Sequence, residues 1–294
     1  MSPPSPTAVR EPSLLEFKDH QPVDAQGARR WSARGQNFDI TLLLATRDGA
    51  SFDTESADET MLLALDGPIA ITGANAAAAP PARSVCVVPP GRWQLRPAAG
   101  SSCVVLRSLR EGADSPALNQ AAYAERDPRI APVGLPYVPL RAGGEIRIIA
   151  IDAIAAPKDR PRVKMLQSAT LSINWSEYQG PRDRTALSPH VHAAIEQGSL
   201  GIAGDFVHHL RVQWGENAQL WQEDRHARLA SPSLMIVPVE LVHTSEGVGT
   251  GHHLLIEVFS PPRADFIAKG WVANAGDYAA PEKSVTCAAH AIPM

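Results

Sequence analysis

Three histidines and a glutamate are spaced in this chain so that they could bind one metal ion. His190, His192 and Glu196 lie in the stretch SPHVHAAIE at positions 188–196, and His243 ends the stretch PVELVH at 238–243. Residues two, four and six apart share one face of an extended strand, so the first three side chains would point the same way. Imidazoles and a carboxylate at one point suit a first-row transition metal. The alternative is that two close histidines lie on a surface strand by coincidence.

The spacing of these residues resembles a known family. H-x-H-x3-E followed by P-x4-H is similar to the two signature motifs of the cupins, although Glu240 stands where the second motif has a glycine. The resemblance implies a small jelly-roll β-barrel with a single metal inside it. On that match the metal ligands would be His190, His192, Glu196 and His243.

Short apolar runs at regular spacing must position these residues. The predicted strands lie at 38–44, 60–65, 68–72, 84–88, 102–106, 146–151 and 171–175. Asp66-Gly67 between two of the runs predicts a hairpin turn. Few segments show helical periodicity and the chain has 26 prolines, so the pattern is typical of an all-β protein.

The chain also repeats itself, which indicates two barrels. The first half holds Asp53, Glu55, Glu59 and Gly67 at the same offsets as His190, His192, Glu196 and Gly204. In the same way PPGRWQ at 89–94 matches 238–243, which aligns Gln94 with His243. We interpret the chain as two tandem cupin (jelly-roll, double-stranded β-helix) barrels, a bicupin. The predicted boundaries are an N-terminal tail or arm (1–30), a first barrel without the metal motif (31–112), a linker (113–140) and a metal-binding barrel (141–294).

The first half lacks imidazoles at the aligned positions. Asp53, Glu55, Glu59 and Gln94 could suit a hard cation such as Mg²⁺ or Ca²⁺. They could equally be the remnant of a site that is now held by hydrogen bonds, or fail to converge. We predict that this barrel holds no transition metal.

The second half has a longer segment between its two motifs, which contains His208, His209 and Arg211. A strand through His208 and His209 must point one ring inward and the other outward. Either ring could act as a pocket acid or base, since imidazole titrates near neutral pH. Arg211, if inward, could hold a substrate carboxylate. A polar residue at a sheet edge is the structural alternative for each histidine.

Composition limits the classes of partner. Apolar residues make up 44% of the chain and charged residues 20%, with a net charge of −4, which suits a soluble globular protein and gives no field for nucleic acid. The sequence shows no secretion signal and no apolar run long enough for a membrane span. Cys86, Cys103 and Cys287 indicate free thiols in a reducing cytoplasm. We also expect a homodimer that buries an exposed sheet edge.

The family resemblance leaves the reaction open. Cupins with this ligand set include dioxygenases, decarboxylases, isomerases and lyases, so the fold does not decide the chemistry. We predict an Fe(II)-dependent dioxygenase that acts on a small oxygenated organic molecule. The alternatives are an isomerase, lyase or decarboxylase that uses the metal as a Lewis acid, and a ligand-binding bicupin without turnover. Fe, Mn, Ni, Cu and Zn all accept these ligands.

Overall fold

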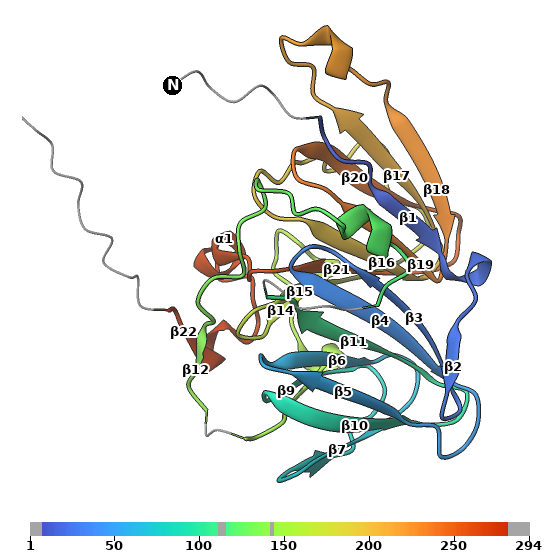
Figure 1. Cartoon of the computed structure of the whole chain (residues 1–294), viewed down its shortest axis with the longest axis vertical. Helices are drawn as coiled ribbons and strands as arrows, with labels where there is room; N and C mark the ends of the chain where they lie inside the picture. The colour runs from blue at the N-terminus through green and yellow to red at the C-terminus, as the bar shows by residue number, and fades with distance from the viewer. Residues whose placement is uncertain (1–7, 111–115, 142–143, 282–294) are drawn as a thin grey trace, which may run out of the picture.

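Two antiparallel β-barrels pack against each other in the computed structural model of the chain (Figure 1), which describes residues 8–110, 116–141 and 144–281. The strands of the N-terminal half are β1 (Ser13–Glu16), β2 (Val23–Ala25), β3 (Ala28–Arg34), β4 (Phe38–Ala45), β5 (Phe52–Ser56), β6 (Thr60–Ala64), β7 (Ile69–Gly73), β8 (Ala77–Ala78), β9 (Ser84–Val88), β10 (Gly91–Pro97) and β11 (Ser102–Ser108). Those that follow are β12 (Val138–Pro139), β13 (Arg147–Ala150), β14 (Val163–Gln167), β15 (Ser172–Gln179), β16 (Gln197–Ala203), β17 (Asp205–Val212), β18 (Arg225–Ala230), β19 (Ser233–Val237), β20 (Leu241–Val248), β21 (His252–Phe259) and β22 (Tyr278–Ala279). The helical segments are short: η1 (Phe17–Asp19), η2 (Gln120–Tyr123), η3 (Ile151–Ala153), η4 (Ala218–Leu220), α1 (Ala264–Ala268) and η5 (Ala275–Asp277).

Each barrel consists of a large and a small sheet. The first barrel has a seven-stranded sheet in the order β13-β9-β6-β11-β4-β3-β2 and a four-stranded sheet in the order β5-β10-β7-β8. The second has a six-stranded sheet in the order β1-β19-β16-β21-β15-β14 and a three-stranded sheet in the order β18-β17-β20. This arrangement confirms the predicted fold class.

The two large sheets share one apolar core. Leu42, Leu63 and Val104 of the first sheet belong to the same buried cluster as Trp175 and Ile256 of the second. Residues on the opposite face of each large sheet line a barrel interior, because successive side chains of a strand alternate between faces. The interior of the first barrel is apolar, and that of the second contains polar side chains.

Each large sheet is completed by a strand from the other half of the chain. β1 pairs with β19 of the second barrel, and β13 pairs with β9 of the first. In Figure 1, β1 lies beside the late strands of the chain. The predicted boundaries need correction here. Residues 13–16 form a sheet strand, β3 pairs with β4 from residue 28 onward, and residues 147–150 belong to the sheet of the first barrel.

The predicted hairpin at Asp66-Gly67 is wrong. β6 pairs with β9 and β11, whereas β7 pairs with β10 and β8 in the other sheet. The Asp66 carboxylate accepts a hydrogen bond from the backbone N–H of Ser102 at 2.6 Å. The turn therefore carries the chain from one sheet to the other, as in a jelly roll, where consecutive strands need not pair.

Two further sequence expectations concern thiols and membranes. Cys86 and Cys103 are buried free thiols within strands, and burial raises the pKa of Cys86 to about 12. Cys287 lies outside the described residues. Among the helices of the described ranges, none has the length and apolar character that a membrane crossing requires.

Candidate metal centre

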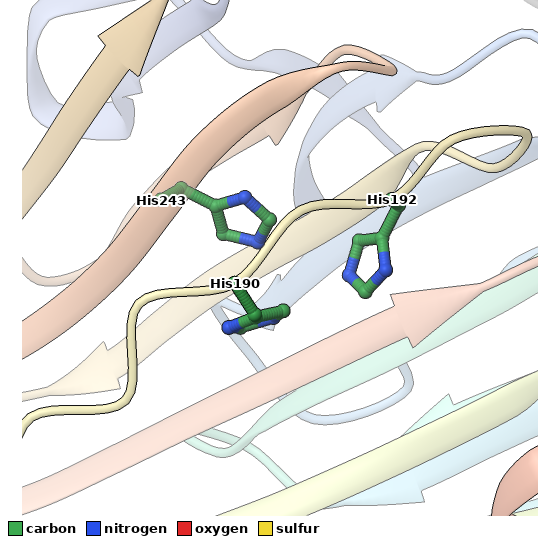
Figure 2. A group of neighbouring side chains, drawn as sticks. All are labelled: His190, His192 and His243. Atoms are coloured by element: carbon green, nitrogen blue, oxygen red, sulfur yellow. The ribbon is translucent and has the colours of Figure 1, made fainter. Parts of the chain in front are cut away.

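Three imidazoles meet at one end of the second barrel. The ligand nitrogens of His190, His192 and His243 all lie within 4.8 Å of one another. Figure 2 shows the three rings turned toward a common space. His243 is 1% exposed and His192 is 7% exposed, whereas His190 is exposed. Two of the three histidines are therefore buried, and His190 lies on the solvent side of the group.

Backbone pairing brings the two motifs together. His190 and His243 form an isolated antiparallel bridge, with N–H···O distances of 3.0 and 2.8 Å in the two directions. The N–H of Glu240 also donates to the carbonyl of His192 at 2.8 Å. Glu240 has a φ of 66°, the conformation that a glycine at this position would adopt without strain. The turn therefore keeps its shape without the glycine of the family motif.

Hydrogen bonds to the protein backbone set the ring tautomers. Nδ1–H of His190 donates to the carbonyl of Ser188, and Nδ1–H of His243 donates to that of Leu241, both at 2.9 Å. A neutral ring that donates through Nδ1 carries a lone pair on Nε2, which is the usual arrangement of a metal-binding histidine. Burial lowers the pKa of His192 to about 4 and of His243 to about 3, so both rings are neutral at neutral pH.

Gln197 places one side-chain oxygen beside the three ring nitrogens. Its Oε1 lies 3.0 Å from Nε2 of His192 and 3.3 Å from Nε2 of His243. Its Nε2 donates to Oγ of Ser199 at 2.9 Å and to Oε1 of Glu257 at 3.1 Å, which fixes the amide orientation. Two acceptors, Oε1 of Gln197 and Nε2 of His243, thus face each other without a hydrogen between them. A cation bound to three imidazoles and this oxygen would satisfy both, so the residues fit a divalent metal.

Glu196, the predicted carboxylate ligand, is directed elsewhere. Its oxygens accept hydrogen bonds from the backbone N–H of Gln36 at 2.5 Å and from the hydroxyl of Tyr123 at 2.9 Å, both outside the second barrel. Burial raises its pKa to about 7. Glu196 does not share a strand face with His190 and His192, because residues 191–196 are irregular and β16 begins only at Gln197. The side chain that points toward the histidines is therefore that of Gln197 and not that of Glu196.

Glu59 aligns with Glu196 in the repeat. It connects the barrels in the reverse sense, from the first barrel to the second. Its carboxylate accepts hydrogen bonds from the backbone N–H of Ala169 and from the hydroxyl of Tyr278, both at 2.8 Å, and from Arg141 at 2.7 Å. Each barrel thus contributes a buried glutamate that accepts a backbone N–H of the other barrel and a tyrosine hydroxyl. The two glutamates are interdomain tethers.

The tyrosines belong to a repeated pair that the sequence reasoning missed. Asn119 lies four residues before Tyr123, as Asn274 lies four residues before Tyr278. The side chain of Asn119 bonds both the N–H and the carbonyl of Arg34, and that of Asn274 does the same to Gln167. In the sequence each pair reads N-x3-Y and follows the strands of one barrel. It marks a segment whose tyrosine bonds the buried glutamate of the other barrel.

The structure separates the three residues predicted to act in the pocket. His208 points into the barrel, is 1% exposed and forms a 2.8 Å hydrogen bond between its Nδ1 and Oγ of Ser245. Burial lowers its pKa to about 4. His209 and Arg211 alternate with it on β17 and lie on the outer face, where His209 contacts His226 and Glu246 and Arg211 pairs with Asp224. The expectation that they share a pocket with the metal ligands is therefore corrected for His209 and Arg211, which instead line a separate cavity.

In the first barrel the aligned residues also lie outside the interior. Asp53 and Glu55 are exposed on β5, and Asp53 bonds Arg92 and Gln94 across the strand pair. Asp53 and Gln94 are register partners, as His190 and His243 are, but the buried pair at this level is the neighbouring one, Thr54 and Trp93. The side chain that points into the first barrel at this level is therefore Trp93, next to the aligned Gln94. These carboxylates do not converge on a common point with Glu59.

A cavity of about 470 Å³ opens next to the metal centre. His190, Ser245 and Glu257 line it together with the ends of β14 and β15 and the segment around α1. Its lining includes five basic side chains against three acidic ones: Arg160, Arg162, Arg182, Arg263 and Lys269 against Asp159, Glu257 and Asp265. A second cavity, of about 630 Å³, lies along the outer face of β17 and β20. The first cavity is therefore the one that a small molecule could enter to reach His190.

Comparison with known proteins places the fold. No family model matches the chain, and no curated protein matches it by sequence. Solved structures do match the chain in fold. An oxalate decarboxylase of Lactobacillus farciminis in complex with formate is 12% identical with a TM-score of 0.57, over 85% of this chain and 86% of that one. A putative glyoxylate-induced protein of Pseudomonas aeruginosa is 14% identical with a TM-score of 0.55, over 89% and 94%. AerE of Microcystis aeruginosa is 8% identical with a TM-score of 0.54, over 87% and 99%. At this identity the likeness shows the fold alone, which is that of two tandem cupin barrels.

Proposed function

We propose that this chain of tandem cupin fold is an enzyme that uses one divalent transition metal in its second barrel to convert a small oxygenated organic molecule. The observation that carries the proposal is the convergence of three ring nitrogens within 4.8 Å beside a cavity. His190, His192 and His243 would hold the metal, with Oε1 of Gln197 as the fourth ligand atom. Fe(II) is the preferred metal, and Mn, Ni, Cu or Zn could occupy the same ligands.

The metal would supply either activation of O₂ or polarisation of a substrate oxygen. The surrounding residues hold the ligands in place. Glu257 accepts hydrogen bonds from Gln197 and from Asn174, at 3.1 and 2.7 Å, so the amide oxygen of Gln197 stays turned toward the histidines. Such outer contacts commonly affect metal affinity by about 10–100-fold.

His208 connects to the cavity through Ser245. Because His208 is neutral at neutral pH, its Nδ1 can accept the hydroxyl proton of Ser245, and Oγ of Ser245 lies in the cavity lining. The pair could therefore take a proton from a molecule in the cavity or return one to it.

Two reaction types are consistent with this site. The first is the Fe(II)-dependent dioxygenase predicted from the sequence. The second is a lyase, decarboxylase or isomerase with the metal as a Lewis acid, and a specific observation favours it. With Gln197 in place of a carboxylate, all four ligand groups are neutral, so none of them offsets the charge of the cation. Several similar solved structures are named as oxalate decarboxylases, which agrees with this second type.

The deciding experiment combines metal analysis with assays in air and under argon. Protein purified from its native host is analysed for metal, and Fe²⁺- and Zn²⁺-loaded protein is tested on diketone, catechol-like, 2-hydroxy-ketone and carboxylic-acid compounds. O₂ consumption that needs both Fe²⁺ and substrate supports the dioxygenase. Equal conversion under argon, or with Zn²⁺, supports the second type. Stoichiometric ligand binding without conversion under any condition would indicate a binding protein.

A further inference from the structure

Two arginines line the cavity beside the metal centre. Arg162 precedes β14, and Arg182 follows β15; both line the cavity that contains His190. Neither guanidinium forms an ion pair within the part of the chain that the structure describes. By contrast, Arg263 in the same cavity is paired with Asp265 through two 2.7 Å contacts. The two arginines therefore lack an ion-pair partner among the described residues, although the charges of Glu257 and Asp183 act on Arg182.

One aromatic ring holds both guanidinium groups. The Cζ atoms of Arg162 and Arg182 lie 5.8 and 5.9 Å from the ring centroid of Tyr178, within the range of a cation–π contact. Tyr178 in turn stacks on His253, with ring centroids 5.1 Å apart and an interplanar angle of 9°. The arginines are thus kept near each other by packing, although their like charges repel.

Arg182 also has an unused hydrogen-bond donor. Its Nε is buried and lacks a hydrogen-bond partner among the described residues, while the guanidinium donates from Nη2 to the carbonyl of Ala186 at 3.3 Å and also bonds the hydroxyl of Tyr178. Burial, and then the charge of Arg162, lower the pKa of Arg182. A buried donor on a cation normally has an acceptor, so an anion would complete this arrangement.

We propose that Arg162 and Arg182 form a carboxylate-binding subsite, and that the substrate is a small dicarboxylate whose second acid group is bound there. This inference rests on the proposed function, because the other end of the molecule must reach the histidines. A guanidinium binds a carboxylate through paired N–H donors, which fixes orientation as well as charge. The cavity of about 470 Å³ limits the substrate to a small molecule.

Calorimetric titration of the full chain loaded with Mn²⁺ tests the subsite. The ligands are oxalate, malonate and succinate, with propionate as a monocarboxylate control. Arg162→Ala and Arg182→Ala should each weaken binding of at least one of the three dicarboxylates by roughly tenfold to hundredfold, the loss expected for one charged hydrogen-bonded contact. Propionate binding should change little, and metal content should stay as in the wild type.

Arg96→Ala is the matched control. Arg96 is an exposed arginine of the first barrel, so its loss removes one positive charge without touching the cavity. It should leave dicarboxylate affinity unchanged. Arg162→Lys and Arg182→Lys keep the charge and remove the paired donors, so they should give an intermediate loss. They also preserve the test if an alanine variant does not fold.

The outcomes separate the subsite from the metal site. If every dicarboxylate binds the two alanine variants as tightly as it binds the wild type and Arg96→Ala, or binds none of these proteins, the subsite does not exist, whatever the metal content. If the chain binds no metal but dicarboxylate affinity still depends on Arg162 and Arg182, the subsite stands and the proposed metal-dependent function fails. Equal losses for propionate and dicarboxylates would also overturn the inference, because the subsite is proposed for the second acid group.

Discussion

Replacing Glu196 tests whether this residue is a tether or a metal ligand. Glu196→Ala would leave the backbone N–H of Gln36 and the hydroxyl of Tyr123 without their present acceptor, and Glu196 itself is 3% exposed. An unsatisfied buried donor costs about 1–3 kcal/mol, which gives a range of about 2–6 kcal/mol for two. Burial of the carboxylate raises its pKa to about 7, because removing the charge from water costs free energy. This desolvation cost offsets part of the stabilisation that the two hydrogen bonds provide. We therefore expect the free energy of unfolding to fall by about 2 kcal/mol, at the lower end of the range.

Glu196→Gln is the matched variant. Its amide oxygen can accept from Gln36 and its amide N–H can donate to the Tyr123 oxygen, so we expect a change below about 1 kcal/mol. Both variants should keep the metal content of the wild type. Gln197→Ala, one residue further on, should instead weaken metal binding by about 10–100-fold.

Urea unfolding followed by tryptophan fluorescence gives the stability of each variant, and elemental analysis gives its metal content. The reasoning fails if Glu196→Gln loses metal while its unfolding midpoint stays unchanged. It also fails if Gln197→Ala retains metal with wild-type affinity.

Four further predictions concern other residues of the site and the interface. His190→Ala should remove stoichiometric metal, which elemental analysis would detect. The double change of Asp53→Ala with Glu55→Ala should leave metal content and stability nearly unchanged, because both side chains are exposed; metal loss in this variant would contradict the placement of the site. Glu59→Ala should cost about 3–5 kcal/mol, more than Glu196→Ala, because it also leaves the largely buried Arg141 without its partner; urea unfolding measures the difference. The pKa of Glu177 is lowered to about 2, chiefly by hydrogen bonds from an arginine of the other barrel. Because the folded value lies below the unfolded value of 4.5, its stabilisation is present above pH 4.5 and is lost as the pH falls toward 2. Glu177→Gln should therefore show a smaller loss of thermal stability than the wild type between these pH values.

The histidine ligands were predictable from the sequence because their spacing is local. His190 and His192 are two residues apart, and Pro238 and the apolar run before it place His243 in a neighbouring strand. The repeat was also visible, since Leu63 and Leu200 pair with Val85 and Leu234 at matching positions of the two large sheets. Apolar periodicity and turn residues are properties of short segments, so they can be recognised in a single sequence.

Other features depend on contacts that a single sequence does not display. Glu196 was assigned by strand parity, but parity has no meaning in the irregular segment before β16. Asp66-Gly67 is a good turn sequence, yet which strands it connects depends on the jelly-roll topology. Whether His208 or His209 faces inward depends on the register of β17 against β20.

The exchange of β1 and β13 between the barrels has a consequence for synthesis on the ribosome. The first barrel lacks its edge strand until residues 147–150 have been translated, and β1, made near the beginning, has no partner until β19 emerges near the end. Neither half can therefore fold to completion while the other is missing. We expect the two barrels to fold and melt in one cooperative transition, and a gene cut between them to yield fragments whose unpaired edges of β9 and β19 promote aggregation.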